Sequence, residues 1–146
     1  MVDFLIKQQW FIIGFIFLII IFYISYIRKK DKKWIEKRFG INKVRVMSFG
    51  VSYFGSTKDM KKPKQIRGFL LLLPDRVFFY NQRKKIKVNI LGKNIIRVYH
   101  DTKHKGVNLN QSLVKIDFKN SDNKKECVAF KVPYPRQWIQ AIEKNF

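Results

Sequence analysis

The eighteen residues from Trp10 to Ile27, WFIIGFIFLIIIFYISYI, contain no charged side chain. As a helix this run would be about 27 Å long, close to the roughly 30 Å hydrocarbon core of a bilayer. Tyr23 and Tyr26 lie near its end, where aromatic rings favour the membrane interface. A signal peptide would have a basic start, a shorter apolar core and small residues at a cleavage site. Here Lys7 is the only basic residue before the run. We therefore expect a transmembrane helix rather than a signal peptide or a buried core helix.

Basic residues are concentrated on one side of this run. The segment RKKDKKWIEKR follows it, and the basic residues there are Arg28, Lys29, Lys30, Lys32, Lys33, Lys37 and Arg38. The positive-inside rule then places the C-terminal part in the cytoplasm and the N-terminus outside, in a single-pass arrangement. The same residues are expected to contact an anionic inner leaflet, or to act only as a stop-transfer signal. Gly40 is a typical residue for the end of the helix.

The formal charge of the chain is +21, from 31 Lys and Arg against 10 Asp and Glu. An excess of this size indicates an acidic partner, either a membrane surface or a nucleic acid, or else a lysine-rich genome composition. Cys127 is the only cysteine, so neither an intrachain disulfide nor a CxxC metal motif is present in this sequence.

A second apolar stretch, GFLLLLPDRVFFYN from Gly68 to Asn81, raises the question of a second membrane crossing. As a helix it would be only about 21 Å long, and Pro74 would break it. Asp75 and Arg76 would each oppose insertion by about 2.5 to 3.5 kcal/mol. Two strands joined by a Pro-Asp turn fit the residues better, so we expect a β-hairpin that is buried on much of both faces.

The remaining segments alternate between apolar and polar residues, as strands do. In VRVMSFGVSYF we expect Met47, Phe49, Val51 and Tyr53 to share one face. Further alternating runs begin near residues 86, 95, 113 and 126, which gives seven strands in all. The last segment places Trp138, Ile142 and Phe146 on one stripe of a short helix. The pattern predicts a mainly β, antiparallel barrel or sandwich with one C-terminal helix.

Three segments in this order resemble a pleckstrin-homology-type domain of the GRAM branch: RGFLLLLPDRVFFYN, KKIKVNILGKNIIRV and RQWIQAIEK. The resemblance extends from about Val44 to Phe146. It implies a seven-stranded antiparallel barrel capped by the C-terminal helix, with Trp138 and Ile142 in the core, and it implies no catalytic activity. The predicted organisation is therefore a short extracytoplasmic tail (1–9), a transmembrane helix (10–27), a basic juxtamembrane helix and linker (28–43), and the barrel domain (44–146).

Pleckstrin-homology domains bind phosphoinositide headgroups through basic residues around their first loop. The resemblance assigns this role to Lys58, Lys61, Lys62, Lys64 and Arg67. A second basic cluster, near the next hairpin, is a further candidate for contact with the same membrane: Arg83, Lys84 and Lys85, followed by Lys87. Two residues separate Lys64 from Arg67, where the family pattern has one. Both clusters are also compatible with plain solvated loops in a lysine-rich chain.

His100 and His104 are four residues apart, but a strand end and a loop are expected there rather than a metal-binding helix. Cys127 has no base that the sequence identifies as its partner. We therefore predict no enzyme activity, no metal and no cofactor.

The expected function is that of a membrane-anchored, non-catalytic binding or scaffold module that recognises a protein partner or an anionic lipid at the inner membrane surface. No small-molecule substrate is expected. Two alternatives are a structural subunit of a membrane protein complex and a membrane-tethered nucleic-acid-binding protein, the latter supported by charge alone.

Overall fold

The computed structural model describes residues 1–59 and 61–146, which form two compact units, Met1–Ile41 and Asn42–Phe146. The first unit is one helix, α1 (Val2–Phe39), which therefore begins eight residues before the predicted membrane span. It ends at Gly40, where φ is 75° and the N–H donates to the Glu36 carbonyl at 3.0 Å. Its most apolar window has a mean hydropathy of 2.6 and contains no buried side chain. By length and composition, α1 is able to cross a membrane.

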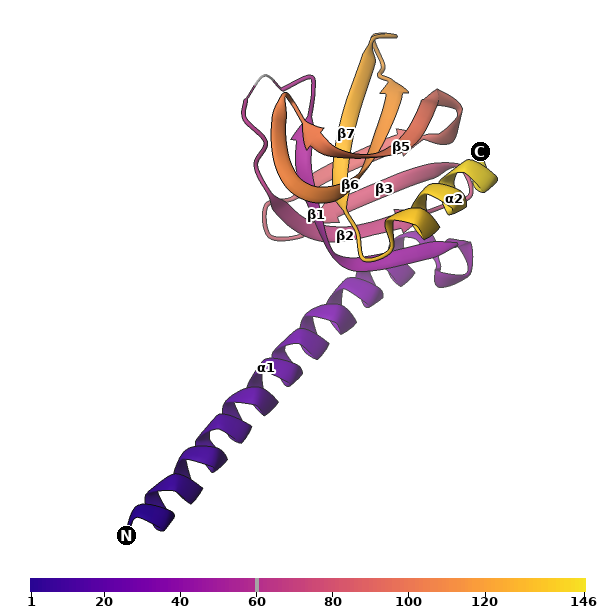
Figure 1. Cartoon of the computed structure of the whole chain (residues 1–146). Helices are drawn as coiled ribbons and strands as arrows, with labels where there is room; N and C mark the ends of the chain where they lie inside the picture. The colour runs from indigo at the N-terminus through magenta and orange to yellow at the C-terminus, as the bar shows by residue number, and fades with distance from the viewer. Residues whose placement is uncertain (60) are drawn as a thin grey trace. The chain divides into compact units, whose positions relative to one another are not determined.

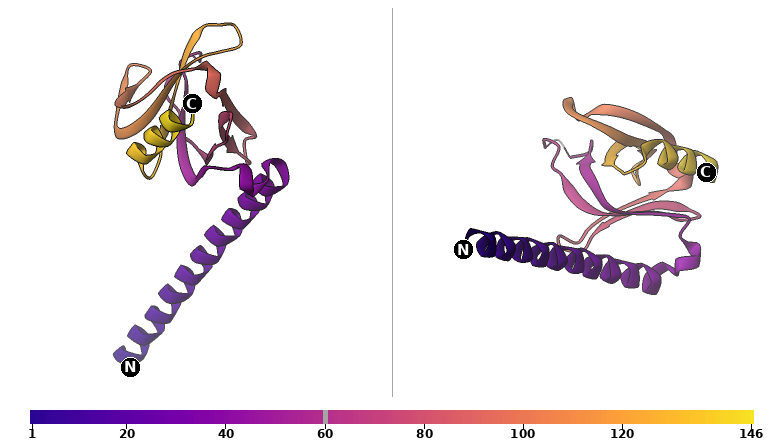
Figure 2. Two further views of the ribbon diagram at one scale, coloured as in Figure 1. Left: turned by 90° about the vertical axis from the view of Figure 1, so that its right-hand side faces the viewer. Right: turned by 60° about the horizontal axis from the view of Figure 1, so that its bottom comes forward.

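The second unit is a curled seven-stranded antiparallel sheet with a C-terminal helix (Figure 1). A short 3₁₀ turn, η1 (Ile41–Lys43), precedes it, and another, η2 (Gly92–Asn94), joins the fourth and fifth strands. The strands are β1 (Val46–Ser56), β2 (Ile66–Leu72), β3 (Arg76–Asn81), β4 (Ile86–Leu91), β5 (Ile95–His104), β6 (Val107–Lys119) and β7 (Lys125–Lys131). Their order in the sheet is β4-β3-β2-β1-β7-β6-β5, so β4 and β5 are its two edges and the barrel is only half closed (Figure 2). The predicted fold class is confirmed.

The stretch from Gly68 to Asn81 forms the β2–β3 hairpin, as predicted. Its turn is closed by a hydrogen bond from the Leu73 N–H to the Arg76 carbonyl at 2.9 Å. Leu70 and Phe79 point into the main core, while Leu71 and Phe78 on the opposite face are also buried. Burial on both faces explains why these strands are apolar at almost every position.

The prediction that Met47 and Phe49 share a face with Val51 and Tyr53 was wrong. The register against β2 shifts between Ser48 and Val51, where Gly50 has a φ of 66° and forms a bulge. A bulge moves side chains from one face of a strand to the other. Val51 belongs to the core as predicted, but Phe49 contacts Phe69 on the other face instead of joining it.

The C-terminal helix α2 (Pro135–Asn145) packs against β5 and β6. Trp138 and Ile142 are buried in the main core, and the Trp138 Nε1–H donates to Ser48 Oγ at 3.0 Å. The ring of Phe146 lies against Gly92, where a Cβ atom would be only 2.1 Å from it. The helix therefore covers one end of the half-barrel and leaves the opposite end to the loops.

Candidate anion-binding cleft

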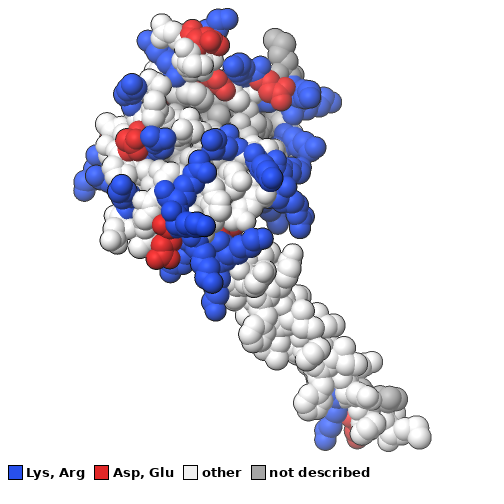
Figure 3. Space-filling view, turned by 180° about the vertical axis from the view of Figure 1, so that it is seen from behind, with Lys and Arg blue, Asp and Glu red and all other residues white. Residues whose placement is uncertain are grey.

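Three loops at one end of the half-barrel surround a cleft of about 650 Å³. They are the β1–β2 loop, the β3–β4 turn and the β5–β6 turn. Six lysines line this space, and we call it the lysine cleft: Lys58, Lys61, Lys62, Lys64, Lys84 and Lys105. Figure 3 shows one face of the molecule, on which Lys and Arg side chains greatly outnumber Asp and Glu over the barrel.

Three apolar or aromatic side chains line the lysine cleft together with the lysines. These are Ile66, Ile86 and Tyr53, and the Tyr53 ring packs on Phe79 and Phe130 with centroids 5.3 and 5.4 Å away. Burial raises the pKa of Tyr53 to about 12, and the nearby carboxylates of Glu126 and Asp59 add to this effect. The phenol therefore stays protonated at neutral pH and is available as a hydrogen-bond donor.

The start of the β1–β2 loop is held to β7 and to itself. The Thr57 N–H donates to the Cys127 carbonyl and the Cys127 N–H donates to Thr57 Oγ1, both at 2.9 Å. The Asp59 side chain accepts from the Lys61 N–H at 3.1 Å. These bonds restrain the backbone at Thr57 and Lys61, next to the other lysines of the loop.

The end of β5 and the β5–β6 turn hold the end of β1 and the same loop, through two residues that we call the β5–β6 clamp, His104 and Lys105. His104 is fully buried, and its Nε2–H donates to the Gly55 carbonyl at 2.8 Å. Lys105 Nζ donates to the Lys61 carbonyl at 3.2 Å. Gly55 has a φ of 87°, and a Cβ there would be 3.0 Å from Lys105 Nζ, so glycine suits this close approach.

The His104 ring is neutral in this setting. Burial lowers its pKa, the hydrogen bond to Gly55 partly opposes this effect, and the charges of Lys115 and Lys105 lower the pKa further. Its Nδ1 atom has no hydrogen-bond partner among residues 1–59 and 61–146. A proton on Nδ1 would therefore be buried without an acceptor, which is unfavourable.

The lysine cleft carries a large excess of positive charge. Its two carboxylates are Asp59 and Glu126, and Glu126 already accepts hydrogen bonds from Ser56 Oγ and from Asn120 Nδ2. Within the described ranges, none of the six lysines forms a salt bridge. Several ammonium groups gathered around one cleft suit a ligand with more than one negatively charged oxygen, such as a phosphate group.

The structure brings together some of the predicted basic residues and leaves others apart. Lys58, Lys61, Lys62 and Lys64 line the lysine cleft together with Lys84 from the second predicted cluster. Arg67, Arg83 and Lys85 do not line it; Arg67 pairs with Ser52 within the β1–β2 ladder. Lys105 was missed, because its place in the cleft depends on β5 and β6 extending to a tight Lys105-Gly106 turn. The juxtamembrane residues Arg28–Arg38 lie on α1, in the other unit.

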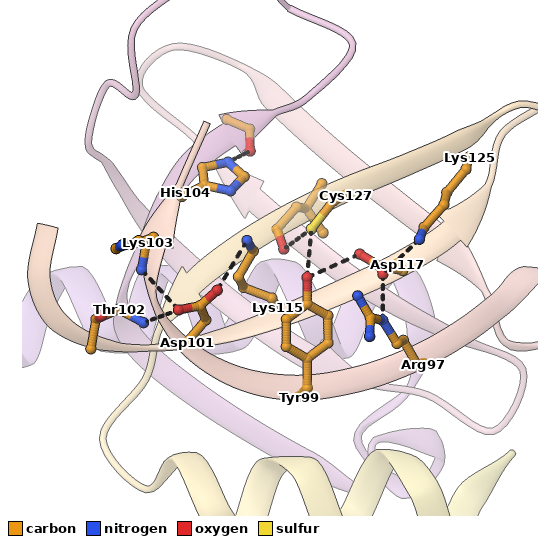
Figure 4. Close-up of polar contacts among 12 residues, drawn as sticks. Arg97, Tyr99, Asp101, Thr102, Lys103, His104, Lys115, Asp117, Lys125 and Cys127 are labelled. Carbon is orange, nitrogen blue, oxygen red and sulfur yellow. Dashed lines mark hydrogen bonds and ion pairs between the residues drawn. The ribbon is translucent and has the colours of Figure 1, made fainter. Parts of the chain in front are cut away.

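A second polar cluster lies on the β5–β6–β7 face, and we call its members Arg97, Tyr99, Asp117, Lys125 and Cys127 the Asp117 network (Figure 4). The Asp117 carboxylate is 2% exposed and accepts from Arg97 Nε at 2.7 Å and from Lys125 Nζ at 3.3 Å. Burial alone would raise the pKa of Asp117, but hydrogen bonds from Cys127, Arg97 and Lys125 outweigh burial and lower it. Burial and the neighbouring Asp117 raise the pKa of Cys127 to about 11, so its thiol is protonated at neutral pH.

The two histidines have separate hydrogen-bond partners, because His100 Nε2 contacts Ser112 Oγ while His104 contacts Gly55. Among residues 1–59 and 61–146, no group of three or more His, Cys, Asp or Glu side chains is placed to hold a metal ion.

No family model matches this chain, and no curated protein matches it. Among solved structures, it is similar to a chain of "The 8S snRNP Assembly Intermediate", with a TM-score of 0.54 at 5% identity over 70% of this chain and 81% of that one. Two others have TM-scores of 0.49. The "Vps36 N-terminal PH domain" is 15% identical over 70% of this chain and 77% of that chain. The C-terminal domain of an unknown protein from Leishmania infantum is 12% identical over 84% and 96%. At such identities the likeness concerns the fold alone.

Proposed function

We propose that this chain is a single-pass, non-catalytic membrane module with a pleckstrin-homology-like barrel whose lysine cleft binds the phosphate groups of anionic lipid headgroups. One observation carries the proposal: three separate loops bring six lysines around one cleft. Hydrogen bonds to β7 and to the β5–β6 clamp also restrain the end of β1 and two residues, Thr57 and Lys61, of the loop that carries four of these lysines.

The anchor in this proposal is α1, with its N-terminus outside and the barrel in the cytoplasm. The uncharged run from Trp10 to Ile27 and the basic residues that follow it support this orientation. Addition of a protease to sealed vesicles with their cytoplasmic side outward should degrade the barrel and leave a protected fragment that contains the helix. Protection of the whole chain would reverse the orientation.

Binding would follow from the geometry of the cleft. A phosphate group entering it would accept charge-assisted hydrogen bonds from several Nζ atoms. Residues 28–38 would contact the anionic surface directly, at about 1 kcal/mol for each basic side chain close to it. Because the barrel is joined to the membrane helix by a few residues, a lipid ligand is always present at a high local concentration. A weak site would then be occupied.

The test uses the full chain in neutral-detergent micelles, titrated with inositol trisphosphate as a soluble headgroup and with inorganic phosphate. The cleft variant is Lys61→Glu with Lys62→Glu and Lys64→Glu. The control reverses the charge of three exposed lysines outside the cleft, Lys103, Lys131 and Lys144. We expect inositol trisphosphate to bind the wild type and the control with similar affinity, and to bind the cleft variant at least about tenfold more weakly, a difference of about 1.4 kcal/mol.

If the cleft variant and the control lose affinity equally, the loss is caused by the change in net charge, and the proposal of a specific site is wrong. A single-stranded oligonucleotide titrated at about 0.15 M salt tests the nucleic-acid alternative, because binding driven by phosphate charge falls steeply with salt. If the oligonucleotide binds more tightly than inositol trisphosphate and the cleft variant abolishes this, the module is a nucleic-acid binder instead.

A further inference from the structure

The outer edge of β4 presents backbone groups that no strand in the described part of the chain pairs with, since β4 ends the sheet order. Antiparallel pairs alternate between residues that exchange hydrogen bonds and residues that do not. The Gly92 N–H donates to the Asp75 carbonyl at 2.8 Å, so these two residues form a hydrogen-bonded pair at the end of the β3–β4 ladder. Every second pair along the ladder is then hydrogen-bonded as well. Val88 and Ile90 therefore bond to β3. It follows that the N–H and C=O groups at residues 87, 89 and 91 face outward.

Beside this edge lies a groove of about 710 Å³ that reaches the core of the half-barrel, and we call it the β4 groove. One wall is β4 from Lys87 to Leu91, and the other is formed by the end of β6 and the β6–β7 turn. Apolar members of the main core line it: Tyr53, Val88, Ile90, Phe118 and Val128. The groove is therefore a gap between a free strand edge and the other half of the sheet, with apolar side chains inside it.

The rim of the β4 groove is basic. Lys58, Lys87 and Lys119 line it, are exposed, and take part in no ion pair among residues 1–59 and 61–146. Arg76 is paired with Asp75 at 2.8 Å, and the single carboxylate in the groove, Glu126, is already bonded to Ser56 and Asn120. A partner for this site must bring negative charge together with apolar side chains.

We propose that the β4 groove binds an extended segment of another protein, in which acidic and apolar residues alternate, by adding it as a strand to β4. An extended segment is the ligand that satisfies a row of outward N–H and C=O groups, and its alternate side chains point to opposite faces. One set would fill the apolar groove while the other would lie beside Lys87 and Asn89 on the outer face. A second copy of this chain fits poorly, because two β4 edges would bring lysines together in chains that each carry +21.

The expected contact is short and specific. β4 contains six residues, a length of about 20 Å, and its three outward residues would exchange up to six hydrogen bonds with the added strand. This inference goes beyond headgroup binding, because it uses the backbone groups of β4 and a groove that shares Tyr53, Lys58 and Glu126 with the lysine cleft but is otherwise lined by different residues.

The test uses the full chain in neutral detergent and a fluorescent peptide of about ten residues that alternates Glu with Val or Ile. Two further versions carry N-methyl groups on alternate backbone amides, one set on the even positions and one on the odd positions. A strand added to β4 uses only one of these sets. We expect one methylated version to bind at least about tenfold more weakly than the parent and the other to bind within about twofold, by fluorescence anisotropy. Equal affinity of both versions, or no binding of the parent peptide at about 1 mM, would overturn the proposal.

Variants of the protein test the same contact from the other side. Asn89→Pro removes one outward N–H but leaves the ladder to β3 intact, as proline is tolerated on strand edges. We expect Asn89→Pro to lower the affinity for the parent peptide at least about tenfold, and Lys87→Glu to lower this affinity at least about fivefold. Lys131→Glu, on an exposed site of β7 outside the groove, should leave the affinity within about twofold.

The triple cleft variant at Lys61, Lys62 and Lys64 separates the two sites. It should leave the peptide affinity within about threefold while it weakens the binding of inositol trisphosphate at least about tenfold. If instead it removes both ligands and Asn89→Pro has no effect, the peptide binds in the lysine cleft by charge alone and the strand-addition proposal is wrong.

Discussion

The lysine cleft and the Asp117 network both gather charged side chains on the same sheet, but they differ in how the charges are balanced. In the Asp117 network, two cations meet one buried carboxylate, which is held at 2.7 and 3.3 Å from them. In the lysine cleft, six cations face two carboxylates and form no salt bridge within the described ranges. We call the Asp117 network balanced because its buried carboxylate is paired within the fold, and the lysine cleft unbalanced because its cations repel one another and favour an external anion. The four predictions below test this difference through the free energy of unfolding, in the absence of ligand.

The largest effect is expected from Asp117→Ala, which removes the buried acceptor of the balanced cluster. We expect the free energy of unfolding to fall by about 2 kcal/mol, in the range for hydrogen bonds to charged groups. Urea unfolding of the full chain in neutral detergent, followed by tryptophan fluorescence, measures it. Asp122→Ala, at an exposed turn, is the control and should change little.

The pKa of Asp117 is lowered in the folded state, so its contribution to stability is present above the ordinary value of 3.8 and is lost as the pH falls through the lowered value. The difference between wild type and Asp117→Ala should therefore shrink only in strong acid. A difference that disappears already at pH 5 would show that the carboxylate is not held as described.

His104→Leu tests the clamp that holds the unbalanced cluster together. Loss of the donor to the Gly55 carbonyl should lower the free energy of unfolding by about 1.5 kcal/mol at pH 7.5. The wild type should also become less stable as the pH falls below the ordinary histidine value of 6.5, because the unfolded state binds a proton that the folded ring accepts less readily. The slope is at most about 1.4 kcal/mol per pH unit for one proton.

In His104→Leu this part of the pH dependence should be absent. His100→Gln, which changes an exposed histidine of the same strand, should keep it. If the slope persists in His104→Leu, another group causes it and the neutral, buried state of His104 is not its source.

Neutralising the cleft should have a smaller effect of opposite sign. Replacing Lys61, Lys62 and Lys64 by Gln is expected to raise the free energy of unfolding by about 0.5 kcal/mol at about 0.02 M salt, because repulsion among the cations is relieved. At about 0.5 M salt, where the charges are screened, the gain should vanish. A loss of stability at both salt concentrations would mean that the lysines are structural and would weaken the comparison.

The smallest effect is expected from Tyr99→Phe. The Tyr99 hydroxyl lies 3.3 Å from Asp117 Oδ1 and 3.8 Å from the Cys127 sulfur, and both contacts are long. We expect a loss of no more than about 0.5 kcal/mol. A loss above about 1.5 kcal/mol would show that the hydroxyl, rather than the two basic side chains, is the main partner of Asp117.

The sequence was sufficient for those features that local pattern and covalent geometry determine. Pro74 and the short apolar runs on either side of it predicted the β2–β3 hairpin, and the stripe that contains Trp138 predicted α2. The bulge at Gly50 was not predictable in this way, because a glycine in an alternating run does not reveal whether its φ is positive. As a result the face of Phe49 was assigned wrongly.

The candidate site was predictable only in part, for a similar reason. The run from Lys58 to Lys64 is visible as a charge cluster, but which other loops approach it depends on strand register and strand length. Lys105 enters because β5 and β6 extend to a tight turn, and Arg67 stays out because it lies within β2, opposite Ser52 of β1, next to Ile66, which lines the cleft. The β4 groove depends on which strand ends the sheet, and the alternation of residues within β4 contains no information on this point.

The β5–β6 clamp also has a consequence for rates. His104 and Lys105 bind backbone carbonyls of Gly55 and Lys61, so the clamp restrains the end of β1 and one residue of the loop that carries four of the lysines. Association of an anion should be accelerated by the positive field of the lysines. For a phosphate ligand the association rate should therefore fall steeply with added salt. Loosening the clamp should mainly shorten the lifetime of the complex, because a mobile loop releases its donors one by one.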